Sequence, residues 1–171
     1  DFITIDELHI TGSISNLITC LNYISNYWTI KNSTLDFAGQ DGIHLLGDRS
    51  NISNNNISHC NQQGILAVGD NETITSNTIR NIGVIPGQAF NGSNASGIAI
   101  AKDNCVIKFN TIENIGYCGI GLSSTADIIT IQNNFINNVL LTLNDGAAIY
   151  TVAEGISRKI DGNIILNVVG N

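Results

Sequence analysis

A short frame of apolar and polar positions recurs along the chain: an Ile, two variable residues, an Asn, one variable residue and a second Ile. A Gly followed by alternating apolar residues lies 10 to 14 residues before the first Ile of each full copy, as in Gly42-Ile43-His44-Leu45. Successive Asn residues of the frame are 22, 33, 24 and 29 residues apart, so the shortest step is the basic unit and the others carry insertions. The full copies are Ile52/Asn55/Ile57, Ile74/Asn77/Ile79, Ile107/Asn110/Ile112, Ile131/Asn134/Ile136 and Ile160/Asn163/Ile165, preceded by the degenerate copy Ile30/Ser33/Leu35.

Each unit contains three short Ile-rich segments in which apolar and polar residues alternate. Alternation with a period of two predicts strands, and no segment shows the 3.6-residue period of a helix. Three strands in so short a unit cannot bury their apolar side chains as isolated hairpins, but the stacked turns of a solenoid can. The stacked Asn side chains of the frame can then form a ladder of amide hydrogen bonds at one bend. A second column, four residues later, consists of Asn81, Asn114, Asn138 and Asn167.

From about Asn22 onward, the Gly-Ile-x segments and the Ile-x-x-Asn-x-Ile frames resemble the repeats of the pectate-lyase-like superfamily. The resemblance implies an all-β fold: a right-handed parallel β-helix with three short parallel sheets and about 22 residues in each basic turn. This fold hosts lyases, hydrolases, epimerases, tailspikes and adhesins, so the fold by itself selects no single function.

We expect a single β-helix domain over residues 1–171, because this length suffices for one substantial core but not comfortably for two. The chain starts without Met and the repeat pattern continues to its last residues, so we expect a fragment of a longer β-helix. Residues 1–28 contain strand-like segments such as Ile3-Thr4-Ile5, but these cannot be aligned with the frame. We therefore predict irregular first turns over residues 1–28.

The composition is typical of a repeat protein and excludes two classes of partner. The chain has 30 Ile, 25 Asn and 17 Gly, but one Pro and no Met. Seven Lys and Arg against fourteen Asp and Glu give a net charge of −7, which argues against binding to nucleic acid phosphates. No apolar stretch approaches the roughly 18 residues of a membrane span, so membrane insertion is not expected. We expect an extracellular, cell-surface or periplasmic protein, as the resemblance implies.

In proteins similar to this one, glycans lie along the sheet formed by the Gly-Ile-x segments, and loops at the flanking bends wall the groove. Alternation predicts five residues on the outer face of this sheet, namely His44, Leu66, Ala99, Gly121 and Ala148. Polar candidates lie at the strand edges, where Asp41, Gln63, Asp145 and Tyr150 are predicted to bind substrate beside Tyr117.

His44 and Tyr117 are the candidate catalytic bases, and Asp41 could orient the His44 ring. The alternative is a surface His beside a turn Asp. Asp41 and Asp145 precede their glycines in matching positions but four turns apart, or about 19 Å at the usual strand spacing. Glycosidase carboxylates work at roughly 5–9.5 Å, so these two are not predicted to form a hydrolytic pair.

A long insertion could build one wall of the groove. Eighteen residues separate Ile79 from Gly97, where seven are usual between a frame Ile and the next Gly. Phe90 could stack on a sugar face beside the hydrogen-bonding Asn91, or it could pack over a corner. A smaller insertion over residues 140–144 is predicted to lie on the same side.

An acidic column precedes the frame by four residues, with Asp48, Asp70, Asp103 and Asp127 in successive turns. Stacked carboxylates repel each other, so something must offset their charge. Each Asp could cap a tight turn, or the column could bind Ca²⁺. We assign no residue as a metal ligand and no cofactor with certainty, and Ca²⁺ is the candidate.

Two functions of different classes remain open. The first is a carbohydrate-active β-helix protein that acts on or binds an extracellular polysaccharide, with lyase chemistry favoured over that of a glycoside hydrolase. Whether the protein is an enzyme stays open, because no catalytic cluster is evident in the sequence. The alternative is a non-catalytic structural β-solenoid, such as an adhesin, a spike or a self-assembling filament segment, with end-to-end self-association through open strand edges.

Overall fold

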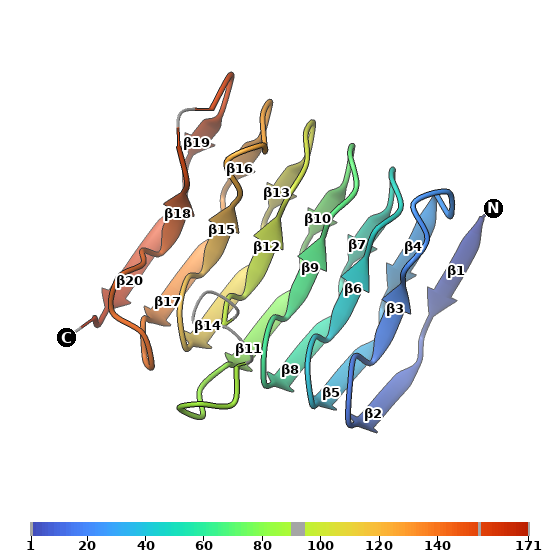
Figure 1. Ribbon diagram of the computed structural model, residues 1–171, viewed down its shortest axis with the longest axis horizontal. Helices are drawn as coiled ribbons and strands as arrows, with labels where there is room; N and C mark the ends of the chain where they lie inside the picture. Colours follow the sequence, from blue (N-terminus) through green and yellow to red (C-terminus); the bar gives the residue numbers. More distant parts are fainter. Residues whose placement is uncertain (1, 90–94, 154, 171) are drawn as a thin grey trace.

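Three parallel β-sheets wind around one apolar interior as a parallel β-helix (Figure 1). The computed structural model describes residues 2–89, 95–153 and 155–170, and within these ranges it contains strands, turns and bends but no helix. Each turn contributes one strand to each sheet, and every strand pairs with the equivalent strands of the neighbouring turns. The all-β solenoid predicted from the repeat is therefore confirmed.

The strands of each sheet share a place in the repeat. Sheet A carries the first Ile of each frame and contains β1 (Ile3–Asp6), β4 (Trp28–Lys31), β7 (Asn51–Ser53), β10 (Thr73–Thr75), β13 (Val106–Lys108), β16 (Thr130–Gln132) and β19 (Lys159–Asp161). Sheet B carries the second Ile and contains β2 (His9–Ser13), β5 (Thr34–Ala38), β8 (Asn56–Cys60), β11 (Thr78–Ile82), β14 (Thr111–Ile115), β17 (Phe135–Val139) and β20 (Ile164–Val168). Sheet C contains β3 (Ile18–Cys20), β6 (Ile43–Leu45), β9 (Ile65–Ala67), β12 (Ile98–Ile100), β15 (Ile120–Leu122) and β18 (Ile149–Thr151). We number the turns from β1–β3 as turn 1 to β16–β18 as turn 6, and β19 and β20 begin turn 7.

The interior is filled by the inward-facing side chains of the strands. Turn 3 is typical, because Ile52 of sheet A, Ile57 of sheet B and Ile65 of sheet C are all fully buried. Apolar residues pair with apolar residues between turns, so that Ile52, for example, packs between Ile30 and Ile74, each about 4.8 Å away along the axis. Burying one such side chain contributes roughly 1.5–3 kcal/mol to the stability of the fold. Because the contribution is repeated in every turn, it stabilises a repeat unit that is too short to fold alone.

At the bend between sheets A and B, buried Asn side chains are hydrogen-bonded from turn to turn. The Oδ1 atom of Asn77 accepts hydrogen bonds from both the backbone N–H and the Nδ2 of Asn55, each at 3.0 Å. The Nδ2 of Asn77 donates to the carbonyl of Ile52 at 2.9 Å and to Oδ1 of Asn110 at 3.1 Å. Asn110, Asn134 and Asn163 continue the same pattern. The column thus satisfies the backbone groups that each bend would otherwise leave unpaired.

The first 28 residues are more regular than the sequence suggested. Their strands β1, β2 and β3 pair in register with β4, β5 and β6, so Ile5 and Ile10 are the two frame positions. Our expectation of irregular first turns failed because Leu8 takes the place of the frame Asn and hides the motif. The frame in turn 1 is Ile5-x-x-Leu8-x-Ile10.

Turn 6 also needs a correction. Alignment on Gly146 placed Ala148 on the outer face, but Ile149 pairs with Ile120 and Tyr150 pairs with Gly121, so Tyr150 is the outer residue. Alternation is unchanged by a slip of two residues, so the pattern alone could not detect the error. The slip also removes the predicted equivalence of Asp145 and Asp41, because Ala147 occupies that place in turn 6.

Candidate functional site

A groove of about 260 Å³ lies on the outer face of sheet C over turns 3 to 6. Its depth comes from the outer column, where the small residues Ala99 and Gly121 lie between Leu66 and Tyr150. One wall consists of Gln63, Ser96, Tyr117 and Cys118, and the other of Ala101, Ser123 and Val152. All lining side chains in the described part of the chain are uncharged, and polar groups lie at the margins of an apolar floor.

Gln63 lines this groove and carries an unpaired acceptor beneath its surface. The residue is 5% exposed, and its buried Oε1 atom has no hydrogen-bond partner. The backbone holds the residue in place, because its N–H donates to Oδ1 of Asp41 at 3.0 Å. An unsatisfied buried oxygen costs roughly 1–3 kcal/mol, so a rotation of the amide that turns Oε1 toward a ligand donor in the groove would recover that cost.

Two tyrosines lie at the far end of the groove. The rings of Tyr117 and Tyr150 are 6.0 Å apart at an angle of 51°. A side chain at Gly146 would collide with the Tyr117 ring, so this Gly makes room for it. Burial, with smaller effects from Cys118 and Asp145, raises the pKa of Tyr117 above its ordinary value. The phenol therefore suits hydrogen bonding and ring packing better than the base role proposed from the sequence.

His44 and Asp41 are brought together one turn beyond the near end of the groove. Nδ1 of His44 lies 3.1 Å from Oδ2 of Asp41, and Asp41 is buried while the His44 side chain is 22% exposed. His44 pairs with Leu66 across the sheet, so its ring faces outward beside the groove. The carboxylate favours the ring proton on Nδ1, which leaves the Nε2 lone pair to accept a proton.

The other predicted site residues do not join this pair. Tyr117 lies three turns from His44, about 14 Å along the axis, so the two cannot act on one bond. Asp145 is exposed and does not line the groove. Phe90 and Asn91 lie outside the described residues.

The two insertions meet each other but line a different hollow. Oγ1 of Thr142 donates to the carbonyl of Gly83 at 3.2 Å, so the 140–144 segment lies against the start of the longer insertion. A hollow of about 140 Å³ between them is lined by residues such as Ile85, Pro86 and Leu143. None of the described residues 83–89 lines the groove on sheet C, and residues 90–94 of the insertion lie outside the described residues.

The acidic column is explained by backbone hydrogen bonds between turns. Oδ1 of Asp48 accepts the N–H of Asp70 at 2.9 Å, Asp70 accepts that of Asp103, and Asp103 accepts that of Asp127. These carboxylates therefore cap the bend of the next turn rather than their own. No group of three or more His, Cys, Asp or Glu within residues 2–89, 95–153 and 155–170 is arranged to hold a metal ion.

The sequence missed Ser96 and Ser123 in the groove. Ser96 directly precedes Gly97, as Gln63 precedes Gly64, so its position was a usable signal. Ser123 follows β15 and lines the opposite wall. Only the register of the neighbouring turns places these two hydroxyls on opposite sides of one hollow.

Comparisons with known proteins bear on the fold. Residues 18–171 match the family described as the right-handed β-helix region. None of the curated proteins compared with the chain matches it significantly. Among solved structures, the chain is similar to the A-module of the mannuronan C-5 epimerase of Azotobacter vinelandii, with 14% identity and a TM-score of 0.37. The match covers 85% of this chain and 56% of that chain, so this chain spans little more than half of that module.

No helix long and apolar enough to cross a membrane occurs in the part of the chain that the structure describes. By its match over residues 18–171, the chain belongs to the right-handed β-helix family.

Proposed function

We propose that this protein binds an extracellular polysaccharide in the groove on the outer face of sheet C. The observation that carries the proposal is the buried, unpaired Oε1 of Gln63 in a groove that also holds two tyrosines. A sugar ring has apolar C–H faces and a rim of hydroxyl donors. The apolar floor and the Tyr150 ring match the faces, and Gln63 and the two serines match the rim.

Of the two reactions considered, a lyase reaction suits this site better than hydrolysis. Hydrolysis needs two carboxylates at roughly 5–9.5 Å, and Asp41 and Asp145 are separated by four turns. β-Elimination from a uronic acid removes the proton on C5 and breaks the C4–O bond, so Nε2 of His44, held by Asp41, would take the proton and return it to the leaving oxygen. Polysaccharide binding in the groove is the primary proposal, and cleavage of the polymer with His44 as the base is a second, more specific one.

Replacing Gln63 with Leu is expected to weaken polysaccharide binding about three- to tenfold while leaving stability unchanged or raised. The reason is that Leu removes the unpaired oxygen and keeps the apolar volume, so the folded protein loses nothing and the ligand loses an acceptor. Binding would be measured by affinity electrophoresis and calorimetry on a panel of neutral and acidic polysaccharides.

Tyr150→Ala in the groove and Tyr23→Ala in an exposed loop form a matched pair for the same panel. The first is expected to weaken binding and the second to leave it unchanged. Wild-type affinity in both Gln63→Leu and Tyr150→Ala would overturn the groove as the binding site.

His44→Gln is expected to lower any polymer cleavage by roughly 10²–10⁴-fold without changing binding, because Gln cannot accept a proton. Release of reducing ends and the ultraviolet absorbance of an unsaturated product would be followed. The assays are run with and without Ca²⁺, because the described lining holds no Lys or Arg to balance a uronic acid. His9→Gln, on the exposed strand β2, is the matched control, and equal loss in both variants would exclude the proposed base.

A non-catalytic structural role is the second candidate, because no charged side chain lines the groove in the described part of the chain. No binding to any polysaccharide, together with a sedimentation coefficient that rises with concentration, would support this role over the first.

A further inference from the structure

One position of sheet B has a left-handed backbone in every turn. Glycine and asparagine tolerate this conformation best, and they occupy the position in five of the seven turns. Phe37 and His59, in adjacent turns, are the exceptions, with φ of 61° and 51°. The residues at this position are Gly12, Phe37, His59, Asn81, Asn114, Asn138 and Asn167. Two rings thus stand where the local conformation disfavours them, and such departures point to function.

The two rings form a stacked pair that the surrounding side chains hold in place. Phe37 and His59 are 4.8 Å apart at an angle of 12°. Nδ1 of His59 contacts Oδ1 of Asp36 at 2.8 Å, and Ser58 donates to the same oxygen at 2.7 Å. Nε2 of His59 lies 3.2 Å from Nδ2 of Asn81 in the next turn. The His59 ring is therefore fixed on both nitrogens, and it supports one face of Phe37.

The Asp36 carboxylate is kept ionised in this arrangement. Partial burial acts to raise its pKa, but the hydrogen bonds from Ser58 and His59 outweigh this and lower the pKa below the ordinary value. A fixed negative charge here holds the ring pair together over the neutral pH range.

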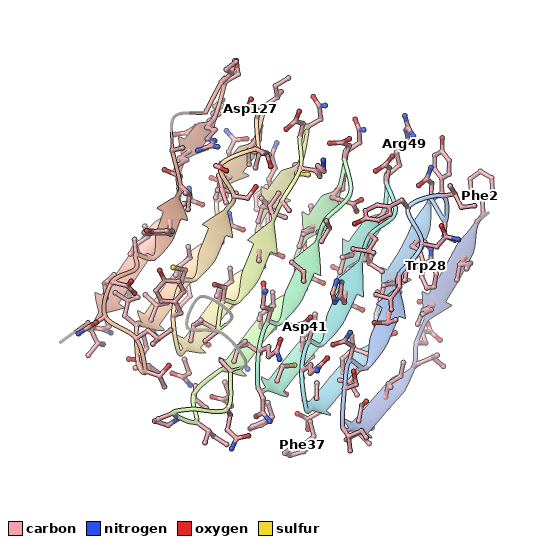
Figure 2. All side chains as sticks on the ribbon, viewed as in Figure 1. Phe2, Trp28, Phe37, Asp41, Arg49 and Asp127 are labelled. Carbon is pink, nitrogen blue, oxygen red and sulfur yellow. The ribbon has the colours of Figure 1, made fainter. Side chains whose placement is uncertain are left out.

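The other face of Phe37 is uncovered because turn 1 has Gly12 at the next place in the column. A Cβ built on Gly12 would meet nothing within 4 Å, and Phe37 is 56% exposed. A hollow of about 340 Å³ lies beside Phe37 toward the following bend, lined by residues of turns 1 to 3 that include Phe37, Ser13, Asn61 and the fully exposed Ile14 but not Gly12. Figure 2 shows Phe37 projecting from the lower edge of the molecule, whereas Arg49 and Asp127 lie at the upper edge. None of the described residues lining this hollow lines the groove on sheet C.

We propose that this hollow is a second carbohydrate subsite, in which one sugar ring stacks on Phe37 beside the space that Gly12 leaves open. In all the other turns a side chain fills the equivalent place in this column. The sugar ring would occupy it in turn 1, at about the distance from Phe37 at which the His59 ring covers the opposite face. Its apolar face meets Phe37 and Ile14, and its hydroxyls meet Ser13 and Asn61. The choice of ligand class rests on the proposed function, but the site itself is separate from the groove.

Two Asn substitutions test the subsite without endangering the fold. Phe37→Asn removes the ring, and Gly12→Asn fills the vacancy with the residue that the column uses in turns 4 to 7. Both are expected to fold as well as the wild type, because Asn tolerates the left-handed backbone. Phe109→Asn is the matched control, since Phe109 is also exposed and left-handed but lies at the bend between sheets A and B.

Binding is followed by ¹H–¹⁵N NMR with cellohexaose, mannohexaose, chitohexaose and hexagalacturonate as probes. We expect shifts of the Gly12, Ser13 and Asn61 amides in the wild type and in Phe109→Asn. In Phe37→Asn and Gly12→Asn the affinity at these amides is expected to fall about three- to tenfold.

The pattern of shifts separates this inference from the proposed function. Shifts confined to the Gln63 and Ser96 groove would overturn the subsite and leave the groove standing. Shifts at Gly12 that persist unchanged in Phe37→Asn would also overturn it, because the ring would then play no part. No shift at either place with any probe would overturn both proposals.

Discussion

Replacing Glu72 with Gln is expected to raise the free energy of unfolding by about 3–5 kcal/mol at pH 8.5 and to change it by less than about 1 kcal/mol at pH 5. Glu72 is fully buried at the bend between sheets C and A. Its Oε2 accepts the N–H of Ser50 at 3.1 Å, but its Oε1 has no partner. The interior therefore holds a carboxyl group whose charge would be poorly compensated.

Burial raises the pKa of Glu72 to about 8 from an ordinary value of 4.5. The hydrogen bond from Ser50 works against this shift, and the carboxylates of Asp48 and Asp70 add to it. Between pH 4.5 and 8 the folded protein holds a proton that the unfolded chain has lost. The free energy of unfolding of the wild type should therefore fall as the pH rises through this range and level off above pH 8. Gln is neutral throughout, so the variant should lack this slope.

Urea unfolding at pH 5, 7 and 8.5 would measure the difference between wild type and variant. All other charged groups are common to both proteins, so their contribution cancels in the comparison. Glu113→Gln is the matched control, because Glu113 is partly exposed and paired with Arg80 on sheet B. If the free energies of unfolding of the wild type and of Glu72→Gln changed with pH by the same amount, Glu72 would already be ionised in the folded protein and the prediction would be wrong.

The fold could be predicted from the sequence because its signal is repeated. Each frame places Ile at two inward positions and an Asn at the bend, and five full copies agree. The role of each residue within the bend was harder to predict. The residue with the left-handed backbone is not the frame Asn but the one before it, such as Asn54 or Phe109. The Asn itself is buried and pairs with the backbone, which follows from its two-sided hydrogen-bonding capacity rather than from its turn propensity.

The groove was only partly predictable, because its depth depends on register. The sequence identified Leu66, Ala99 and Gly121 as residues of the outer face of this sheet. The structure adds Tyr150 to this column through a two-residue slip that alternation cannot detect, and small residues beside a large ring then make a hollow. The unpaired oxygen of Gln63 is likewise a property of packing, which no local pattern contains.

The second large effect is expected at the buried Asn column, where Asn77→Ala should lower the free energy of unfolding by about 3–5 kcal/mol. The substitution leaves the backbone N–H of Asn55 without its acceptor and the carbonyl of Ile52 without its donor. Each orphaned buried group costs roughly 1–3 kcal/mol, and the lost volume adds a cavity. Asn51→Ala, at an exposed position of β7, should change stability by no more than about 0.5 kcal/mol.

Turn 2 already contains a substitute for the Asn, and it predicts the rank order of variants. Oγ of Ser33 accepts the N–H of Leu8 at 3.1 Å, as the Asn side chain does for the preceding turn, but it donates to the carbonyl of Lys31 in its own turn at 2.8 Å, so a hydroxyl replaces one of the two pairings. Asn77→Ser should therefore recover part of the stability that Asn77→Ala loses, although it cannot reach Asn110 in the next turn. Equal losses for Ser and Ala in urea unfolding would mean that the cavity and the contact with the next turn, rather than the orphaned backbone groups, set the cost.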